Sequence, residues 1–289
     1  MASIKSLIPS NVLTEMVEET LRKSLVFGDT VNKDYEGIIR FAGDSVRIPV
    51  IGDVTISTHT VNDTLTYEAL DSADMVLKID QMKRFSFAVD KADQAQALIN
   101  VAQKYADRAA YQLADEADQY IATKHADAGI VSNLGITALP LTITAAASSG
   151  SNISFYELLS RIATGMDNKN VPQQGRVVVI PPWAHGKAVM AGMLQYLSGD
   201  ANAYTNGSVG KLMGFDIRVS TNVVNYNTTG SKIMAYNESA ISFAGQLLDI
   251  ETLVLESKMG TGVRGLYIYG AKTVQSDALA VATVSEATG

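Results

Sequence analysis

Hydrophobic residues near the start of the chain recur every fourth position. Between residues 10 and 27 the stripe consists of Leu13, Val17, Leu21 and Leu25. This spacing predicts an amphipathic helix with one narrow apolar face, ended by Gly28. The predicted helix precedes any core-forming segment. It therefore either packs on its own domain or lies as an arm across a neighbouring subunit.

Between residues 45 and 90 the pattern changes to a period of two. Apolar side chains alternate with polar ones or proline at Val46, Ile48, Val50, Val54, Ile56, Met75, Leu77, Ile79, Phe85, Phe87 and Val89. This alternation predicts long antiparallel strands with one apolar face. A two-stranded ribbon is only marginally stable in water unless that face is covered. Either the body of the domain or another chain must therefore cover it.

A long helix is predicted from residue 91 to about residue 127. The stripe is Leu98, Ala102, Tyr105, Ala109, Leu113, Ala117 and Tyr120 or Ile121, and the segment contains neither glycine nor proline. At 1.5 Å per residue its length would be roughly 55 Å, well beyond that of an average globular helix. We expect this helix to be a backbone element of the fold.

A second unit with both helices and strands follows a stretch rich in glycine, alanine, serine and threonine at 132–152, which we interpret as a loop or short ribbon. Ser154 is the expected cap of a helix reaching about Met166, and a further helix is expected at 183–197. A polar loop is expected at 199–208, and a short turn at 209–213 closed by Gly214. The strands are expected at 176–180, 215–220, 233–236, 240–243, 253–256 and 266–274.

The composition narrows the function classes. Of 289 residues 47% are hydrophobic and 18% charged, so the chain can bury a sizeable core. It has no cysteine, which excludes disulfides, thiolate zinc sites and a cysteine nucleophile. The formal net charge of −7 disfavours avid general binding to nucleic acid. We see neither a signal peptide nor a membrane-spanning segment, and we expect a protein made and kept in the cytosol.

The search for chemistry yields little. None of His59, His125 and His185 has a second histidine at metal-binding spacing. The carboxylates of the long helix resemble a solvated helix face. Gly-Thr-Gly-Val-Arg-Gly at 260–265 matches a dinucleotide fingerprint in its letters, but a strand-like pattern follows it where the fingerprint needs a helix. We interpret it as a flexible turn between two strands. No catalytic, metal-binding or cofactor-binding residue is predicted.

Several short segments resemble tailed-bacteriophage coat proteins. They are Leu-Arg-Lys-Ser-Leu-Val-Phe at 21–27, Asp-Tyr-Glu-Gly at 34–37, Gly-Asp-Ser-Val-Arg-Ile-Pro at 43–49 and Gly-Lys-Leu-Met-Gly-Phe-Asp-Ile at 210–217. The order of elements is also similar to that family: an arm, a long ribbon, a long helix, an α/β part and returning strands. The resemblance covers nearly the whole chain.

The resemblance implies an α+β fold of the Hong Kong 97 capsid type. That fold has an N-terminal arm, an extended β-hairpin called the E-loop, a peripheral domain with a spine helix, and an α/β axial domain. The implied division is 1–35 for the arm, 45–90 for the E-loop ribbon, 91–152 and 246–289 for the peripheral domain, and 153–245 for the axial domain.

The implied function is that of a major capsid protein, which is not an enzyme and needs no cofactor. Copies would assemble into hexamers and pentamers of an icosahedral head in the host cytoplasm, and would enclose double-stranded DNA without reading its sequence. The chain itself would be the main partner, with scaffolding, portal and decoration proteins as further partners and no membrane. In the virion the protein would form the shell.

Since one copy should not be able to bury the apolar strips of the first ninety residues, we expect subunit contacts there. The candidates are Leu13, Val17, Leu21, Leu25, Phe27, Arg47, Met75, Leu77, Ile79, Arg84, Phe85 and Phe87. Two other functions remain open. One is the shell of an encapsulin-like nanocompartment, which would bind a cargo peptide. The other is a soluble nucleotide-binding α/β enzyme that uses the glycine-rich segment at 260–265.

Overall fold

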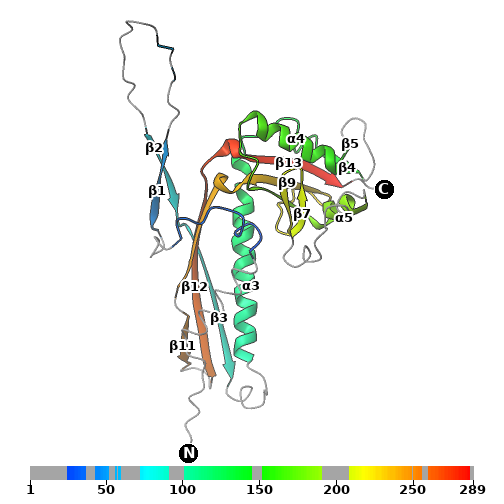
Figure 1. Ribbon diagram of the computed structural model, residues 1–289. Coiled ribbons are helices and arrows are strands. Elements are labelled where there is room, and N and C mark those ends of the chain that lie inside the picture. The colour runs from blue at the N-terminus through cyan, green and yellow to red at the C-terminus, as the bar shows by residue number, and fades with distance from the viewer. Residues whose placement is uncertain are drawn as a thin grey trace, which may run out of the picture.

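The computed structural model describes residues 25–36, 43–51, 56, 58–59, 72–90, 101–144, 152–190, 208–248, 250–255 and 260–286. Within this part of the chain the strands form three sheets, accompanied by α-helices. Figure 1 shows a long slab in which one helix runs beside extended strands, a more compact part at one end of it, and a separate two-stranded ribbon. The predicted α+β class is confirmed.

The compact part is built on a seven-stranded mixed sheet in the order β5-β4-β13-β9-β6-β8-β7 (Figure 1). The strands are β4 (Leu141–Thr144), β5 (Asn152–Ser154), β6 (Arg176–Ile180), β7 (Ser208–Leu212), β8 (Phe215–Val219), β9 (Gly230–Asn237) and β13 (Leu279–Glu286). All five residues of β6 are buried, which suits a continuous run of β-branched side chains inside a sheet. The strand predicted at 176–180 is therefore confirmed.

Two helices pack within this part, α4 (Phe155–Asn168) and α5 (Pro182–Met190). The hydroxyl of Ser154 accepts a hydrogen bond from the backbone N–H of Glu157 at 3.2 Å, so the predicted cap is confirmed. The apolar stripe of α4 is buried and includes Leu158, Leu159, Ile162 and Met166. The second helix begins where it was predicted. Its expected continuation at 191–197 lies outside the described residues.

Two details of the predicted strands were wrong. Residues 209–213 are mostly strand β7, which pairs with β8 through a tight turn at Met213 and Gly214, both with positive φ. The sequence predicted a turn where β7 lies, because Val-Gly-Lys-Leu is too short to show the alternation of a strand. Strand β13 was not predicted. Its alanine-rich residues 279–284 are all buried, so no face-to-face alternation marks them.

The slab consists of a second sheet and the long helix. Strand β12 (Gly260–Thr273) is central: β3 (Gln81–Asp90) pairs along one edge, and β10 (Ile241–Leu247) and β11 (Glu251–Val254) follow each other along the other. Helix α3 (Val101–Ala122) runs beside these strands (Figure 1). Its 22 residues span about 33 Å. A 3₁₀ turn, Thr123–Asp127, continues it, and two more lie at Glu238–Ala240 and Ser276–Ala278. The predicted start at 91–100 lies outside the described residues.

The glycine-rich segment 260–265 is part of strand β12 and not a turn between strands. At its start the N–H of Leu255 donates to the carbonyl of Gly260 at 3.1 Å. Gly262 and Gly265 pair with Ala88 and Phe85 of β3. No helix N-terminus follows the segment, since β12 continues to Thr273. The dinucleotide-binding hypothesis therefore loses its structural basis.

The ribbon contains only part of the alternating segment. Strand β1 (Ser45–Ile51) pairs with β2 (Ser72–Lys78), whereas β3 leaves the ribbon and joins β12. The change of partner occurs at Ile79 and Asp80, directly before the polar residues Gln81 and Lys83 that interrupt the apolar alternation. Near this point the ribbon crosses the slab: Ile48, Leu77 and Ile79 form a small core with Ala244 and Ile268. The body of the chain thus covers this end of the ribbon.

The crossing can be tested at Gly270. A Cβ atom there would meet the carbonyl oxygen of Lys78 and would lie 3.1 Å from the Cα of Ile79. Both contacts involve backbone, so Gly270→Ala should lower the free energy of unfolding of the dissociated subunit by about 1–3 kcal/mol. Gly186→Ala in α5 is the control, because its Cβ would meet nothing within 4 Å. It should raise stability by roughly 0.5–1 kcal/mol. Equal urea midpoints for the two variants would contradict the crossing.

Candidate subunit interface

The structure divides the twelve residues predicted at subunit contacts into three groups. Leu13, Val17 and Leu21 lie outside the described residues. Leu25, Phe27, Leu77 and Ile79 are buried in the chain's own cores. For these four the premise that one copy cannot bury them was wrong, because α3, β9, β10 and β12 cover them from distant parts of the chain. The remaining five, Arg47, Met75, Arg84, Phe85 and Phe87, are exposed or half-buried.

Leu25 and Phe27 belong to the segment 25–32, hereafter the strap, which is attached to the rest of the chain by several contacts. Phe27 is fully buried and stacks on Tyr236 of β9 with ring centroids 6.5 Å apart. The Thr30 hydroxyl lies 2.6 Å from the Tyr236 hydroxyl. The N–H of Asn32 donates to the carbonyl of Ile241 at 3.0 Å, and the N–H of Phe243 donates back to Asn32 at 2.9 Å. The strap is therefore anchored to both sheets.

A carboxylate on α3 forms the other anchor of the strap. Asp118 accepts the N–H of Val26 at 2.7 Å on Oδ2 and the N–H of Gly28 at 3.0 Å on Oδ1, and its side chain is 1% exposed. Burial raises the pKa of Asp118 to about 6, although the strap N–H groups oppose this shift. The neighbouring Asp115 adds a small upward effect on the same pKa.

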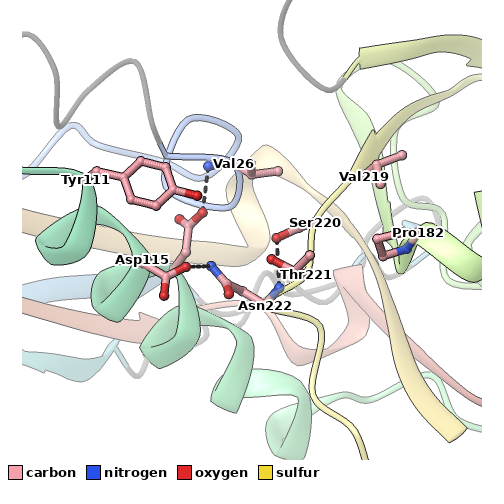
Figure 2. A pocket seen from close by; sticks show the side chains of 9 residues that line it. Val26, Tyr111, Asp115, Pro182, Val219, Ser220, Thr221 and Asn222 are labelled. Carbon is pink, nitrogen blue, oxygen red and sulfur yellow. Dashed lines mark hydrogen bonds between the residues drawn. The ribbon is translucent and has the colours of Figure 1, made fainter. Parts of the chain in front are cut away.

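A polar hollow of about 210 Å³ lies beside Asp118. Figure 2 shows its walls, formed by Val26 of the strap, Tyr111 and Asp115 of α3, and the turn after β8. Asn222 of that turn donates to Asp115 at 2.7 Å. The hollow connects three elements, but its charged groups are two carboxylates already engaged in hydrogen bonds. We find no nucleophile paired with a base along its walls.

The exposed candidates lie on the ribbon and on β3. Arg47 is 78% exposed and 3.7 Å from Asp74 on the paired strand, which is a weak surface contact. Phe85 and Phe87 point toward α3, where the Phe87 ring lies 5.6 Å from the ring of Tyr105. Lys83 on the same face is 2.6 Å from Glu116 of α3. Arg84, which alternates with them, therefore faces away from α3.

The slab surface that faces away from α3 is only partly covered. The ribbon buries Ile268 and Ala244 on it, but the β3 edge and the residues nearer the other end of the slab are left open. Strand register places these exposed or half-exposed residues on one face, hereafter the open face: Met82, Arg84, Ser86, Ala88, Glu251, Leu253, Gly262 and Arg264. Arg264 donates from Nε to Glu251 at 2.7 Å across the strands. The open face thus combines apolar side chains with arginine.

Another exposed apolar feature was missed from the sequence. Ile136 and Leu139 pair across a tight turn, each donating its N–H to the other's carbonyl, and their side chains are 60% and 67% exposed. Val131 nearby is also exposed. The segment 132–152 was interpreted as a loop from its small polar residues. Two large aliphatic residues flanking Thr137 and Ala138 were the available signal.

The side chain of His125 has a structural role. His125 is held between the carbonyl of Ala122, 3.0 Å from Nδ1, and Lys232 Nζ, 3.0 Å from Nε2, and burial lowers its pKa.

A second hollow, of about 360 Å³, lies along α4 beside Gly129, Asn133 and Arg161. In the described part of the chain, no three histidine or acidic side chains are grouped so that they could hold a metal ion.

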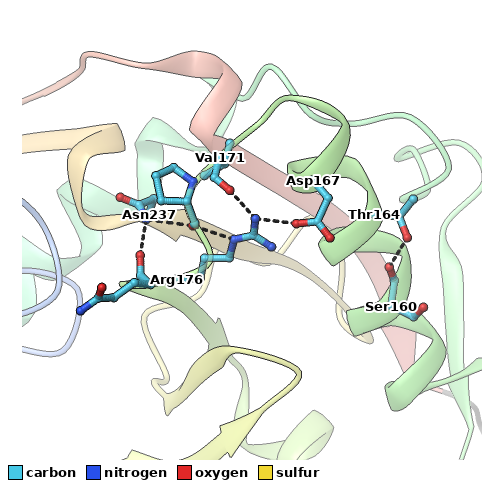
Figure 3. Close-up of polar contacts among 8 residues, drawn as sticks. Ser160, Thr164, Asp167, Val171, Arg176 and Asn237 are labelled. Atoms are coloured by element: carbon cyan, nitrogen blue, oxygen red, sulfur yellow. Dashed lines mark hydrogen bonds and ion pairs between the residues drawn. The ribbon is translucent and has the colours of Figure 1, made fainter.

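Arg176 is the most deeply buried cation in the described residues. Its guanidinium donates to the carbonyls of Val171 at 2.5 Å and Pro172 at 2.9 Å, and to Asp167 at 2.7 Å (Figure 3). Asn237 donates to the neighbouring carbonyl of Gln174 at 2.9 Å. These bonds fix the loop between α4 and β6. The bonds from Nε and Nη2 all end on this loop and on α4, so Arg176 has a structural role.

The fold is similar to that of several solved phage structures. A chain of Mycobacterium phage Che8 is 25% identical, with a TM-score of 0.66 over 89% of this chain and 90% of that chain. The capsid of the cyanophage P-SCSP1u gives 20% identity and a TM-score of 0.65 over 93% and 90%. The capsid of Ralstonia phage GP4 gives 15% and 0.64 over 90% and 88%. No family model and no curated protein matches the sequence.

The chain therefore has the Hong Kong 97-type capsid fold. The resemblance to tailed-phage coat proteins, noted in short segments of the sequence, is confirmed as a likeness of the fold. A virus-like particle from Pyrococcus furiosus shares this fold, at 12% identity and a TM-score of 0.57 over 94% of this chain and 98% of that chain. None of the described helices is both long and apolar enough to span a membrane.

The structural role of Arg176 predicts an asymmetry between two substitutions. Arg176→Ala leaves two loop carbonyls without their donor and should lower the free energy of unfolding by about 3 kcal/mol. Asp167→Asn should cost less than about 1 kcal/mol, because the Asp167 side chain is half-exposed and the loop keeps its arginine. Urea unfolding of the dissociated subunit measures both. Equal losses would show that Arg176 contributes to stability through its ion pair with Asp167 and not through its hydrogen bonds to the loop carbonyls.

Proposed function

We propose that this protein is the shell subunit of a tailed-phage head. The observation that carries the proposal is a shared fold over about nine-tenths of both chains with the capsids of cyanophage P-SCSP1u and Ralstonia phage GP4. The fold has an extended outline, in which the ribbon and the slab reach out from the compact part (Figure 1).

The surfaces that one copy leaves uncovered support assembly. The open face presents Met82 next to Arg84 on β3, and Leu253 on β11 across the sheet, a mixture of apolar side chains and arginine that is common where proteins meet. The hairpin of Ile136 and Leu139 presents a second apolar contact. Specific interfaces each bury roughly 1,200–2,000 Å² in total, so several moderate contacts per subunit would stabilise a closed shell.

In its finer form the proposal has copies forming hexamers and pentamers of an icosahedral shell. Residues 1–35 act as the arm, 45–90 as the E-loop ribbon, 91–152 and 246–289 as the peripheral domain and 153–245 as the axial domain. The arm would also contribute Leu13, Val17 and Leu21 to subunit contacts. The shell is built in the host cytoplasm, with scaffolding, portal and decoration proteins as partners, and encloses double-stranded DNA. A net charge of −7 suits a lining that does not retain DNA.

A nanocompartment shell is the second candidate. It is favoured by the fold shared with the virus-like particle from Pyrococcus furiosus, which covers nearly all of both chains. The two candidates differ in their contents. Particles from the natural source that protect DNA from nuclease support a phage head, whereas particles that hold a packaged protein and no DNA support a nanocompartment.

Assembly is the first test. The chain expressed alone should form hollow particles of uniform size, seen by negative-stain electron microscopy and light scattering, because its uncovered faces have only other copies to contact. A chain that remains monomeric at high concentration, and equally so with co-expressed neighbouring phage genes, would contradict both shell candidates.

Charge reversal on the open face is the second test. Arg84→Glu should leave the urea midpoint of the dissociated subunit within about 0.5 kcal/mol, because the side chain is exposed. It should raise the concentration needed for assembly by roughly tenfold or more, since a misplaced charge at an interface costs over 1.4 kcal/mol. Arg84→Lys, which keeps the charge, is the matched control. If both variants assemble like the wild type, Arg84 lies at no subunit contact.

A further inference from the structure

The strap is attached to α3 through a buried carboxyl group that has no positive partner among the described residues. Asp118 receives two backbone N–H groups of the strap and is almost completely buried. In the described part of the chain, no lysine, arginine or histidine forms an ion pair with it. Hydrogen bonds from N–H groups offset only part of the cost of burying a negative charge.

The charged and titratable groups on the surrounding elements do not supply the missing cation. On α3 the nearest is Asp115, itself acidic and bonded to Asn222. Directly after the strap, Lys33 lies 4.0 Å from Asp29 of the strap. On β8, Arg218 is paired with Asp216 at 3.2 Å. Tyr236 of β9 shares its hydroxyl with Thr30, and Tyr111 of α3 lines the hollow.

The hollow gives the carboxyl group a place for a proton. Both oxygens of Asp118 already accept an N–H from the strap. In the protonated group, the carbonyl oxygen still accepts its strap N–H. The hydroxyl hydrogen can point into the polar space of about 210 Å³ that Asp118 itself lines. Protonation thus removes the buried charge without displacing the strap.

We infer that the strap and Asp118 form a pH-dependent latch, in which the docked strap is held more firmly when the carboxyl group is protonated. When the strap leaves, Asp118 on α3 becomes exposed to water and its charge costs little. Docking and proton uptake are therefore linked, and each favours the other. This device acts within one subunit and goes beyond the proposed function.

The direction of the effect follows from the two states. With the strap released, the pKa of Asp118 is near its ordinary value of 3.8, and with the strap docked it is about 6. The additional stability of docking is complete below about pH 4 and is lost as the pH rises through about 6. The limiting change in the docking equilibrium is roughly 100-fold, the size expected for a difference of about two pKa units.

Hydrogen–deuterium exchange on the assembled or purified full chain tests the latch. Peptides that contain Val26 and Gly28 are followed by mass spectrometry between pH 4.5 and 7.5, and the rates are corrected for the intrinsic effect of pH. The wild type should lose protection at these amides as the pH rises, by tens of fold. Asp118→Asn, which cannot titrate, should give a flat profile. Asp107→Asn, on the same helix and away from the strap, should keep the wild-type profile.

Two results would overturn the latch: a flat profile in the folded wild type, or a wild-type profile in Asp118→Asn. If Asp118→Asn does not fold, the wild type alone suffices. Carbon-13 NMR of aspartate-labelled protein, with magic-angle spinning on sedimented particles if it assembles, then follows the Asp118 carboxyl. A titration midpoint near 6 supports the latch, and one near 4 contradicts it.

Discussion

Strand β12 has to be covered on both faces, and the rest of the slab depends on how this is done. On one face, α3 packs against aromatic side chains, with Tyr120 and Tyr269 5.5 Å apart in an edge-to-face arrangement. On the other face, the end of the ribbon places Leu77 and Ile79 against Ile268. The ribbon backbone passes so near Gly270 that a side chain there has no space. The ribbon is thereby fixed relative to the slab.

This arrangement leaves the open face of the slab uncovered, and this uncovered surface connects the fold to its proposed function. A single subunit uses its ribbon to cover Ile268 near one end of β12 and leaves Arg84 and Leu253 open toward the other. The polar interactions of Arg176 and Asp118 are turned inward and hold loops in place. Here they stabilise a scaffold whose surfaces can meet other copies.

The strap adds a second level of organisation, because it joins parts that the sheets leave separate. Its contacts reach α3 through Asp118, the seven-stranded sheet through Tyr236 and the slab through Asn32. Any change in how firmly it is docked therefore reaches the slab and the compact part together. A buried charge without a cation makes this contact weaker than a neutral one, which is the physical origin of its dependence on pH.

Local patterns were sufficient for α4 with its Ser154 cap and for the buried strand β6, because capping and β-branched runs depend on near neighbours. They did not show that the alternating segment changes partner after Lys78, that Gly260 and Gly265 lie within a strand, or that β13 exists. Nor could they show that Phe27 and Leu77 are buried within their own chain while Arg84 and Ile136 are not. Strand partners and burial are decided by residues far away in the sequence, and only the folded chain brings those residues together.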